Sequence, residues 1–175
     1  DFGSTEYYKR RTGYHRACGI TVRNAANQIV GSGTVQPDGS FTLSLSPAQG
    51  DGGMLSITLT DAAGNTSVAG NIASPDLIAP DLPLNLQVNA AGTLLSGTGE
   101  AGAEVIVRNA ANQVVGTGTV LADGSFSVTL SPAQTDGLPL SITLTDTAGN
   151  TSAAVTINSP DLLAPDIPFN LQVNA

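Results

Sequence analysis

Residues 123–130 read Asp-Gly-Ser-Phe-Ser-Val-Thr-Leu, and this stretch gives the clearest indication of the fold class. Apolar Phe126, Val128 and Leu130 alternate with small polar residues, a two-residue period that predicts a β-strand with one buried face. The Asp-Gly pair in front of it is typical of a tight turn, because both residue types adopt turn conformations readily. A turn followed by a half-buried strand indicates a sheet that covers a core on one side.

The same alternation extends outward from this strand. Leu140, Ile142 and Leu144 alternate with serine and threonine, and turn-forming clusters recur at intervals of roughly 8–12 residues, as in a β-sandwich. No stretch shows the 3.6-residue period of a helix, so the predicted fold class is all-β. We expect seven strands, near residues 84–90, 93–98, 104–109, 113–120, 125–131, 140–146 and 151–158. The predicted core consists of Leu86, Val88, Val105, Val107, Phe126, Val128, Leu130, Leu140, Ile142 and Leu144.

The chain is a tandem repeat in which Arg23 returns as Arg108, and we call the difference between these two positions the repeat offset. The stretch Asp38–Phe41, for example, returns at the same offset as Asp123–Phe126. When residues 20–90 are aligned with 105–175 without a gap, 51 of 71 pairs are identical. Such self-similarity at a fixed period is the signature of an array of structural units. A structure predicted for one period is therefore expected in the other.

This offset divides the chain into unequal parts. Residues 82–160 hold all seven predicted strands and form the complete repeat. Residues 19–75 form a partial repeat without the first two strands, because residues 1–18 do not resemble 86–103. We interpret residues 1–18 as an anomalous N-terminal segment, with three explanations left open: a tag, a frame-shifted stretch of coding sequence, or a divergent cap.

The predicted linker between the two repeats is 76–81. Pro75 and Pro80 favour extended backbone, so we expect a semi-rigid joint. Residues 161–175 repeat this linker and add the first strand of a further repeat. We therefore expect the chain to be a piece of a longer array.

Composition and charge exclude several classes of protein. The chain carries 6 basic and 14 acidic residues, a net charge of −8 at pH 7, so it repels the phosphate backbone of nucleic acids. With one cysteine, Cys18, and one histidine, His15, a repeat can form neither a disulfide, a zinc cluster nor a Ser–His–Asp arrangement. The sequence has no apolar run of the roughly 18 residues that a membrane span needs. We therefore expect no enzyme, no nucleic-acid partner and no membrane span in these residues.

Four motifs, in this order along the chain, carry a family resemblance: Gly97–Ala103, Asp123–Phe126, Thr145–Asn150 and Ala164–Pro168. Together they make residues 19–175 resemble the bacterial Ig-like tandem repeats of large biofilm-associated (Bap-type) cell-surface adhesins of Gram-negative bacteria. The resemblance implies tandem Ig-like seven-stranded β-sandwich repeats that serve as stalk or adhesive modules. It also implies an extracellular location on the bacterial cell surface. In related adhesins calcium often stiffens the domain junctions.

Acidic residues near the linker are candidate calcium ligands. Calcium takes about six to eight oxygen ligands from carboxylates, carbonyls and water. In the Ig-like topology implied by the resemblance, three loops lie at the end where the first strand enters the domain. The predicted metal-ligating residues there are Asp76, Asp81, Glu100, Asp146 and Asn150. The alternative interpretation is that acids such as Asp123 and Asp146 only form turns.

We expect these repeats to be structural extender or adhesive modules that contribute to cell adhesion and biofilm formation. Their expected partners are neighbouring repeats of the same chain, and the same array on other cells or adjacent subunits. One alternative is an extracellular filament subunit, in which residues 168–175 complete the deficient first repeat of a neighbouring chain by β-strand addition. Another is a carbohydrate-binding appendage. Against it, Phe41 and Phe126 fall at alternating positions that predict burial in the core rather than an exposed sugar platform.

Overall fold

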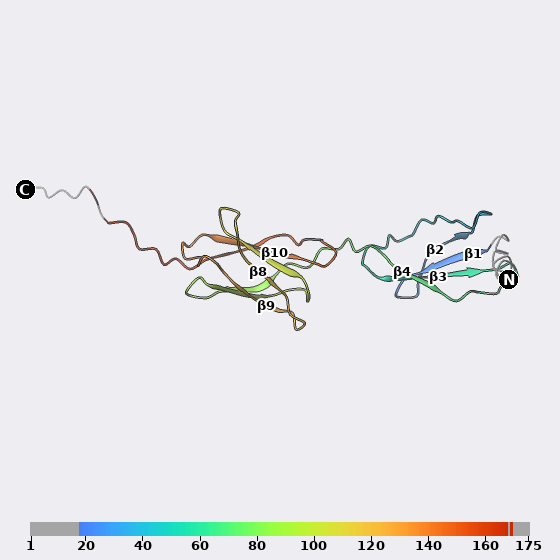
Figure 1. The fold of residues 1–175 in the computed structure, drawn as a ribbon, viewed down its shortest axis with the longest axis horizontal. Helices are drawn as coiled ribbons and strands as arrows, with labels where there is room; N and C mark the ends of the chain where they lie inside the picture. The colour runs from blue at the N-terminus through green and yellow to red at the C-terminus, as the bar shows by residue number, and fades with distance from the viewer. Residues whose placement is uncertain (1–17, 168, 170–175) are drawn as a thin grey trace, which may run out of the picture. The chain divides into compact units, whose positions relative to one another are not determined.

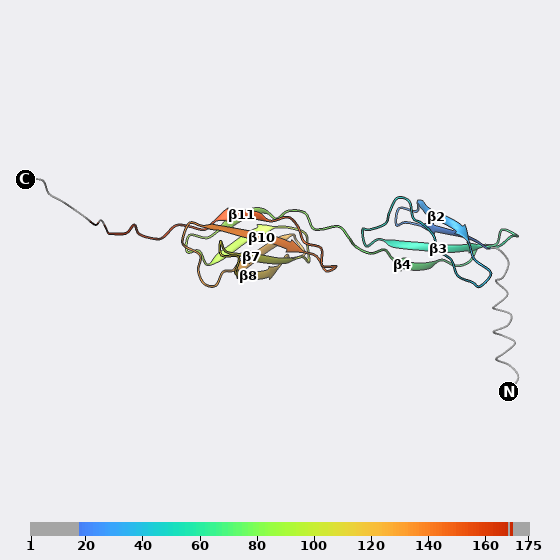
Figure 2. The ribbon, with the colours of Figure 1, turned by 90° about the horizontal axis from the view of Figure 1, so that it is seen from above.

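The computed structural model describes residues 18–167 and 169, and every regular element in them is a β-strand, which confirms the predicted all-β class. Among these residues no helix is long and apolar enough to cross a membrane. The chain divides into two compact units, Asp1–Ile78 and Ala79–Ala175, called the first and second unit below. Figures 1 and 2 show the strands of each unit in two perpendicular views. Apart from Cys18 and Phe169, the anomalous segment 1–18 and the predicted strand 168–175 lie outside the described residues.

The second unit is a sandwich of two antiparallel sheets. One sheet has the strand order β11-β10-β7-β8 and the other the order β5-β6-β9. Their bounds are β5 Leu84–Val88, β6 Leu94–Thr98, β7 Glu104–Arg108, β8 Val114–Thr119, β9 Ser125–Thr129, β10 Pro139–Thr145 and β11 Val155–Asn158. All seven predicted strands are present. β11 begins later than predicted, because Thr151 makes only an isolated bridge with Thr145 after the turn that precedes it.

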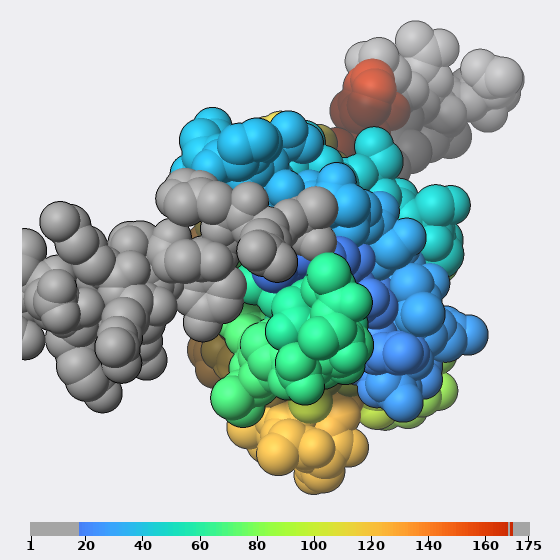
Figure 3. All heavy atoms as spheres, turned by 90° about the vertical axis from the view of Figure 1, so that its right-hand side faces the viewer, coloured from blue at the N-terminus to red at the C-terminus, as the bar shows by residue number. Residues whose placement is uncertain are grey.

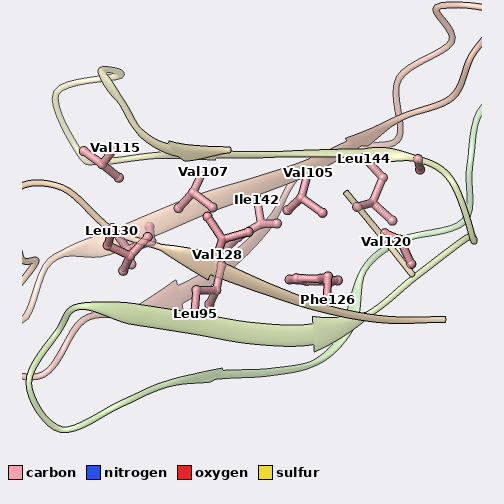
Figure 4. Packing of buried hydrophobic residues seen from close by; sticks show 12 residues of the cluster. Leu95, Val105, Val107, Val115, Val120, Phe126, Val128, Leu130, Ile142 and Leu144 are labelled. Atoms are coloured by element: carbon pink, nitrogen blue, oxygen red, sulfur yellow. The ribbon is translucent and has the colours of Figure 1, made fainter. Parts of the chain in front are cut away.

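The core of the second unit lies between the two sheets, as Figure 4 shows. Phe126, Val128 and Leu130, the apolar residues of the stretch 123–130, are 3%, 1% and 3% exposed. The buried members of the cluster are Leu95, Ala103, Val105, Val107, Val115, Val120, Phe126, Val128, Leu130, Leu140, Ile142 and Leu144. Leu86 and Val88 are partly buried and pack against it. All ten predicted core residues are therefore confirmed.

The first unit has one four-stranded antiparallel sheet, in the order β2-β1-β3-β4. The strands are β1 Gly19–Arg23, β2 Ile29–Thr34, β3 Met54–Thr60 and β4 Gly70–Ala73. Shifted by the repeat offset, these bounds coincide with β7, β8, β10 and β11. The register is also the same, since Ile20 lies opposite Leu59 as Val105 lies opposite Leu144. The described residues of this unit contain no counterpart of the β5-β6-β9 sheet.

Phe41 is not a core residue, contrary to the prediction from its sequence pattern. Its stretch Asp38–Phe41 is identical to Asp123–Phe126, yet Phe41 is 44% exposed. Residues 40–44, which correspond to β9, form no strand. In the second unit β9 is paired with β6, and no described residue of the first unit takes the place of β6. The prediction that Phe41 is a core residue was wrong, because the alternation is present but no strand among the described residues of the first unit covers it.

Residues at the start of the predicted linker 76–81 are bonded to the first unit. Asp76 forms an isolated bridge with Asp51, and the backbone N–H of Leu77 donates to the Gly50 carbonyl at 2.8 Å. The second unit repeats both contacts at the repeat offset. The division between the two units falls after Ile78.

Candidate functional site

Two of the five predicted metal-ligating residues, Asp81 and Glu100, line one pocket of the second unit together with Asp123. The pocket has a volume of about 360 Å³, and its lining consists of Asp81, Leu82, Leu84, Thr98, Gly99, Glu100, Asp123 and Gly124. Strands β5 and β6 build it, because Asp81 precedes β5, Glu100 follows β6, and the strands pair through Leu84 and Thr98. The result is an acidic depression at the end of the unit where β5 begins.

In this pocket Asp123 is also a turn residue. Its Oδ1 accepts hydrogen bonds from the Ser125 backbone N–H at 2.9 Å and from the Ser125 hydroxyl at 2.7 Å. The turn closes through Gly124, whose φ of 81° is one that glycine adopts without strain. The Ser125 hydroxyl, followed by its backbone N–H, holds the pKa of Asp123 below its ordinary value. The carboxylate therefore stays charged at mildly acidic pH, with one oxygen used by the turn.

Asp146 and Asn150, also predicted as ligands, bind each other and do not line this pocket. Asp146 Oδ1 accepts the backbone N–H groups of Ala148 at 2.8 Å and Asn150 at 2.9 Å. Its Oδ2 accepts the Asn150 side-chain amide at 2.8 Å. That amide is the largest cause of a lowered pKa for Asp146. Both carboxylate oxygens of Asp146 thus hold the turn between β10 and β11 closed.

The first unit contains the same two turns. Asp38 bonds Ser40 as Asp123 bonds Ser125, and Asp61 bonds Asn65 as Asp146 bonds Asn150. Figure 3 views the end of the first unit at which these turns lie, with residues 36–40 in light blue and 61–65 in green. These hydrogen bonds are those of turn residues, the alternative that the sequence left open for Asp123 and Asp146. Both repeats therefore use these acids to close their loops.

Asp76 belongs to the first unit, at the end from which the chain leaves it. Its Oδ1 accepts the Ile78 backbone N–H at 3.1 Å, and its backbone bridges to Asp51. Asp51 in turn accepts the Gly53 N–H at 3.0 Å and the Ser74 hydroxyl at 3.2 Å. The Gly53 N–H is the largest cause of a lowered pKa for Asp51. Asp76 thus sits beside a second carboxylate in a closed loop.

Sequence reasoning missed the structural pair made by Asp51 and Ser74. Its counterpart in the second unit is Asp136 with Ser159, whose hydroxyl donates to Asp136 at 2.9 Å. Both serines are buried, at 6% and 5% exposed, although serine is usually a surface residue. The available signal was that the Asp and the Ser recur together at the repeat offset. The pair ties the last strand of each unit to the loop before its neighbouring strand.

The five predicted ligands are not gathered in one place within a single unit. Calcium takes about six to eight oxygen ligands. Among residues 18–167 and 169, no three acidic, histidine or cysteine side chains are close enough together to hold a metal ion. The predicted cage combines Asp76 of the first unit with four residues of the second, so it requires both units and stays a prediction.

The chain is similar to known proteins in sequence and in structure. The sequence model of a family described as bacterial Ig domain matches residues 15–76 and 79–161. The search of curated proteins found no match to this chain. Among solved structures, the BSP domain of a biofilm associated protein matches with 26% identity and a TM-score of 0.42, covering 85% of this chain and 26% of that one. The FN1–FN3 domains of chicken CNTN1 match with 10% identity and a TM-score of 0.39, covering 83% of this chain and 56% of that one. This chain thus spans about a quarter of the first structure's length and just over half of the second's.

Proposed function

The chain belongs to the bacterial Ig domain family, and on this basis we propose that its repeats are structural extender or adhesive modules of a bacterial cell-surface adhesin. In this role they hold an adhesive region away from the cell and contribute to cell adhesion and biofilm formation. The repeats act outside the cell, and their contribution is mechanical rather than catalytic. Their partners are neighbouring repeats and the same array on other cells.

One observation carries the proposal: a complete repeat encloses its own core. Leu95 from one sheet and Ile142 from the other are both 0% exposed, and both belong to the cluster between the sheets. Such a unit does not need a neighbour to bury these core residues. The stability of an array is then a sum of unit and junction contributions, so its length can change by whole repeats. An extender needs this property.

The distribution of charge fits a solvated extracellular module. Residues 19–175 carry twelve acidic residues against two arginines. Both arginines bind within their own hairpin turns, Arg23 to the Asn27 carbonyl at 2.9 Å and Arg108 to the Asn112 carbonyl at 3.2 Å. The described surface therefore offers no cluster of positive charge for an acidic polymer.

Stepwise removal of repeats from the natural full-length protein tests this function. Whole repeats are deleted in series, and surface display, cell adhesion and biofilm mass are measured on living cells. If repeats are extenders, adhesion declines gradually as the array shortens, while display stays constant. The matched control replaces deleted repeats with unrelated Ig-like modules of equal number, which restores adhesion to an extender. Unchanged adhesion after most repeats are removed, with equal display, contradicts the proposal.

A further inference from the structure

The described residues of the two units differ in the sheet β5-β6-β9, which only the second unit has, and this difference has consequences for binding. In the second unit β6 pairs antiparallel with β9, so that Leu95 lies opposite Val128 and Gly97 opposite Phe126. Figure 4 shows Leu95 beside Val128 in the core. At the repeat offset, β6 aligns with residues 9–13, which read Lys-Arg-Arg-Thr-Gly and share nothing with Leu-Leu-Ser-Gly-Thr. The backbone of residues 41–45 makes no hydrogen bond to any described residue.

Segment 41–45 has no backbone partner among the described residues, and yet its two ends are bonded as the ends of β9 are bonded. At its start the Gln36 N–H donates to the Ser40 carbonyl at 2.8 Å, as Leu121 donates to Ser125 at 2.7 Å. At its end the Ser46 N–H donates to the Val30 carbonyl at 2.8 Å, and the second unit repeats this bond at the same distance. The start of the segment is thus closed by a turn and its end is bonded to β2, as in the second unit, so the backbone between them can accept a strand.

Segment 41–45 carries a row of three apolar side chains, those of Phe41, Leu43 and Leu45. Phe41 is 44% exposed where Phe126 is 3% exposed. Leu43 and Leu45 are half-buried and pack against the core of the first unit, whereas Val128 and Leu130 are buried. Burial also differs between β3 and β10. Ile57 and Leu59 of β3 are half-buried, whereas their counterparts in β10, Ile142 and Leu144, are buried. Within its described residues, the first unit therefore leaves open the surface that β5 and β6 cover in the second.

We infer that the first unit is an acceptor for a β-strand donated by another molecule, and that this strand follows the sequence pattern of β6. It adds antiparallel to residues 40–44, with its leucine opposite Leu43 and its glycine opposite Phe41, which is the register of β6 on β9 moved by the repeat offset. Strand addition supplies backbone hydrogen bonds for affinity and side-chain pockets for specificity. The second unit shows how such a strand fits, because β9 has the same alternation and the same Ser-Phe start as residues 40–44 and is already paired with β6 there.

Glycine is what makes the acceptor selective. In the second unit a Cβ on Gly97 would lie 2.5 Å from Phe126 Cζ and 2.9 Å from Leu86 Cδ2. The Phe126 ring thus occupies the space that a side chain at position 97 would need. Because Phe41 is the residue equivalent to Phe126, a donor must carry glycine at that position. Residues 168–175, proposed from sequence as the completing strand, align with β5, which pairs with β6 and not with β9. No described strand lies beside residues 41–45, and the strand that fits there is therefore of the β6 type.

Fluorescence anisotropy with a labelled synthetic peptide tests this acceptor site on the full 175-residue chain. The peptide carries the sequence of residues 80–99, and saturable binding is expected. A Gly97→Val peptide is expected to bind about tenfold more weakly or worse, because overpacking of this kind costs about 1–3 kcal/mol. Phe41→Ala in the chain should restore part of the binding of the Gly97→Val peptide, whereas Thr42→Ser should not.

Disulfide trapping then fixes the register. A Ser96→Cys peptide should cross-link to a Thr42→Cys chain, because directly opposed residues of an antiparallel pair have the Cα separation that a disulfide needs. A Thr98→Cys peptide should not cross-link to a Ser44→Cys chain, since the register places Thr98 opposite Ser40 instead. Cys18 is 6% exposed and is left in place. Absence of binding, or equal cross-linking of the two pairs, overturns the proposal, and neither outcome bears on the extender function.

Discussion

Phe126 is a buried member of the second unit's core, and Phe41 holds the same position in the first repeat without a described strand to cover it. Full burial of a side chain of this size contributes about 1.5–3 kcal/mol relative to exposure. At 3% exposed Phe126 gains nearly all of that contribution, and at 44% exposed Phe41 gains a part of it. The two residues therefore form a natural matched pair, with similar neighbours in sequence and different surroundings in space.

We expect Phe126→Ala to lower the free energy of unfolding of the second unit by about 3–5 kcal/mol, the range for phenylalanine truncation in a packed core. Phe41→Ala, the control, should cost the first unit about 1 kcal/mol or less. Urea denaturation followed by hydrogen exchange and mass spectrometry resolves the two units separately. Equal losses for the two variants would mean that Phe41 is covered as well as Phe126.

At the scale of the element, the loops are closed by carboxylates. The pKa values of six aspartates are held below the ordinary value, and each of the six accepts hydrogen bonds in a turn or loop: Asp38, Asp51, Asp61, Asp123, Asp136 and Asp146. A lowered pKa means that the folded chain binds fewer protons than the unfolded chain between the two values. The stabilisation is therefore present above about pH 4, the unfolded value, and lost as the pH falls through the lowered pKa values.

Asn150→Ala tests this account at one turn. The Asn150 amide is the largest cause of the lowered pKa of Asp146, so its removal should move that pKa upward toward the ordinary value. Carbon-detected NMR titration of Asp146 between about pH 2 and 6 measures the shift, with Asp61 in the same chain as the internal control. The melting temperature of the variant should also depend less on pH below about 4. An unmoved Asp146 titration would show that the backbone N–H groups alone set its pKa.

At the scale of the whole molecule, the surplus of carboxylates raises the question of a cation. Residues 19–175 carry a net charge of −10, from twelve acids and two arginines. Asp81 and Glu100 already share a pocket of the second unit, and Asp76 precedes them in the chain at the end of the first unit. Mutual repulsion between carboxylates falls when a divalent ion binds them. Pro75 and Pro80 restrict the chain between the units, so little ordering entropy remains to be lost on binding.

We expect calcium to stabilise the 175-residue chain if these acids form the predicted cage. Binding adds RT ln(1 + [L]/Kd), about 2.7 kcal/mol when free calcium exceeds Kd a hundredfold. Calorimetry should show a higher melting temperature in millimolar calcium than in EDTA. Small-angle scattering should show a narrower distribution of the distance between the two units in calcium than in EDTA. Asp81→Ala combined with Asp146→Ala should remove both differences, with Asp38→Ala as the control. If calcium changes neither measurement in the parent chain, these acids do not form a calcium site.

Much of this protein follows from local patterns in its sequence. The two-residue period of apolar side chains predicted seven strands and ten core residues of the second unit, because the pleat of a strand imposes that period locally. The turn alternative for Asp123 and Asp146 was also readable, since each carboxylate bonds residues within four positions of itself. Asp81 and Glu100 could be brought together from the order of strands that the family resemblance implies.

The state of residues 40–44 depended instead on tertiary pairing. They match β9 in pattern and in their Asp-Gly-Ser-Phe start, and yet they form no strand. A strand needs hydrogen-bonding partners from another part of the chain, and β7 and β8 separate β6 from β9 in the sequence. The pair of Asp51 with buried Ser74 likewise joins residues 23 positions apart. Local pattern determines which face of a segment is apolar, but burial and pairing depend on whether a distant segment comes to cover it.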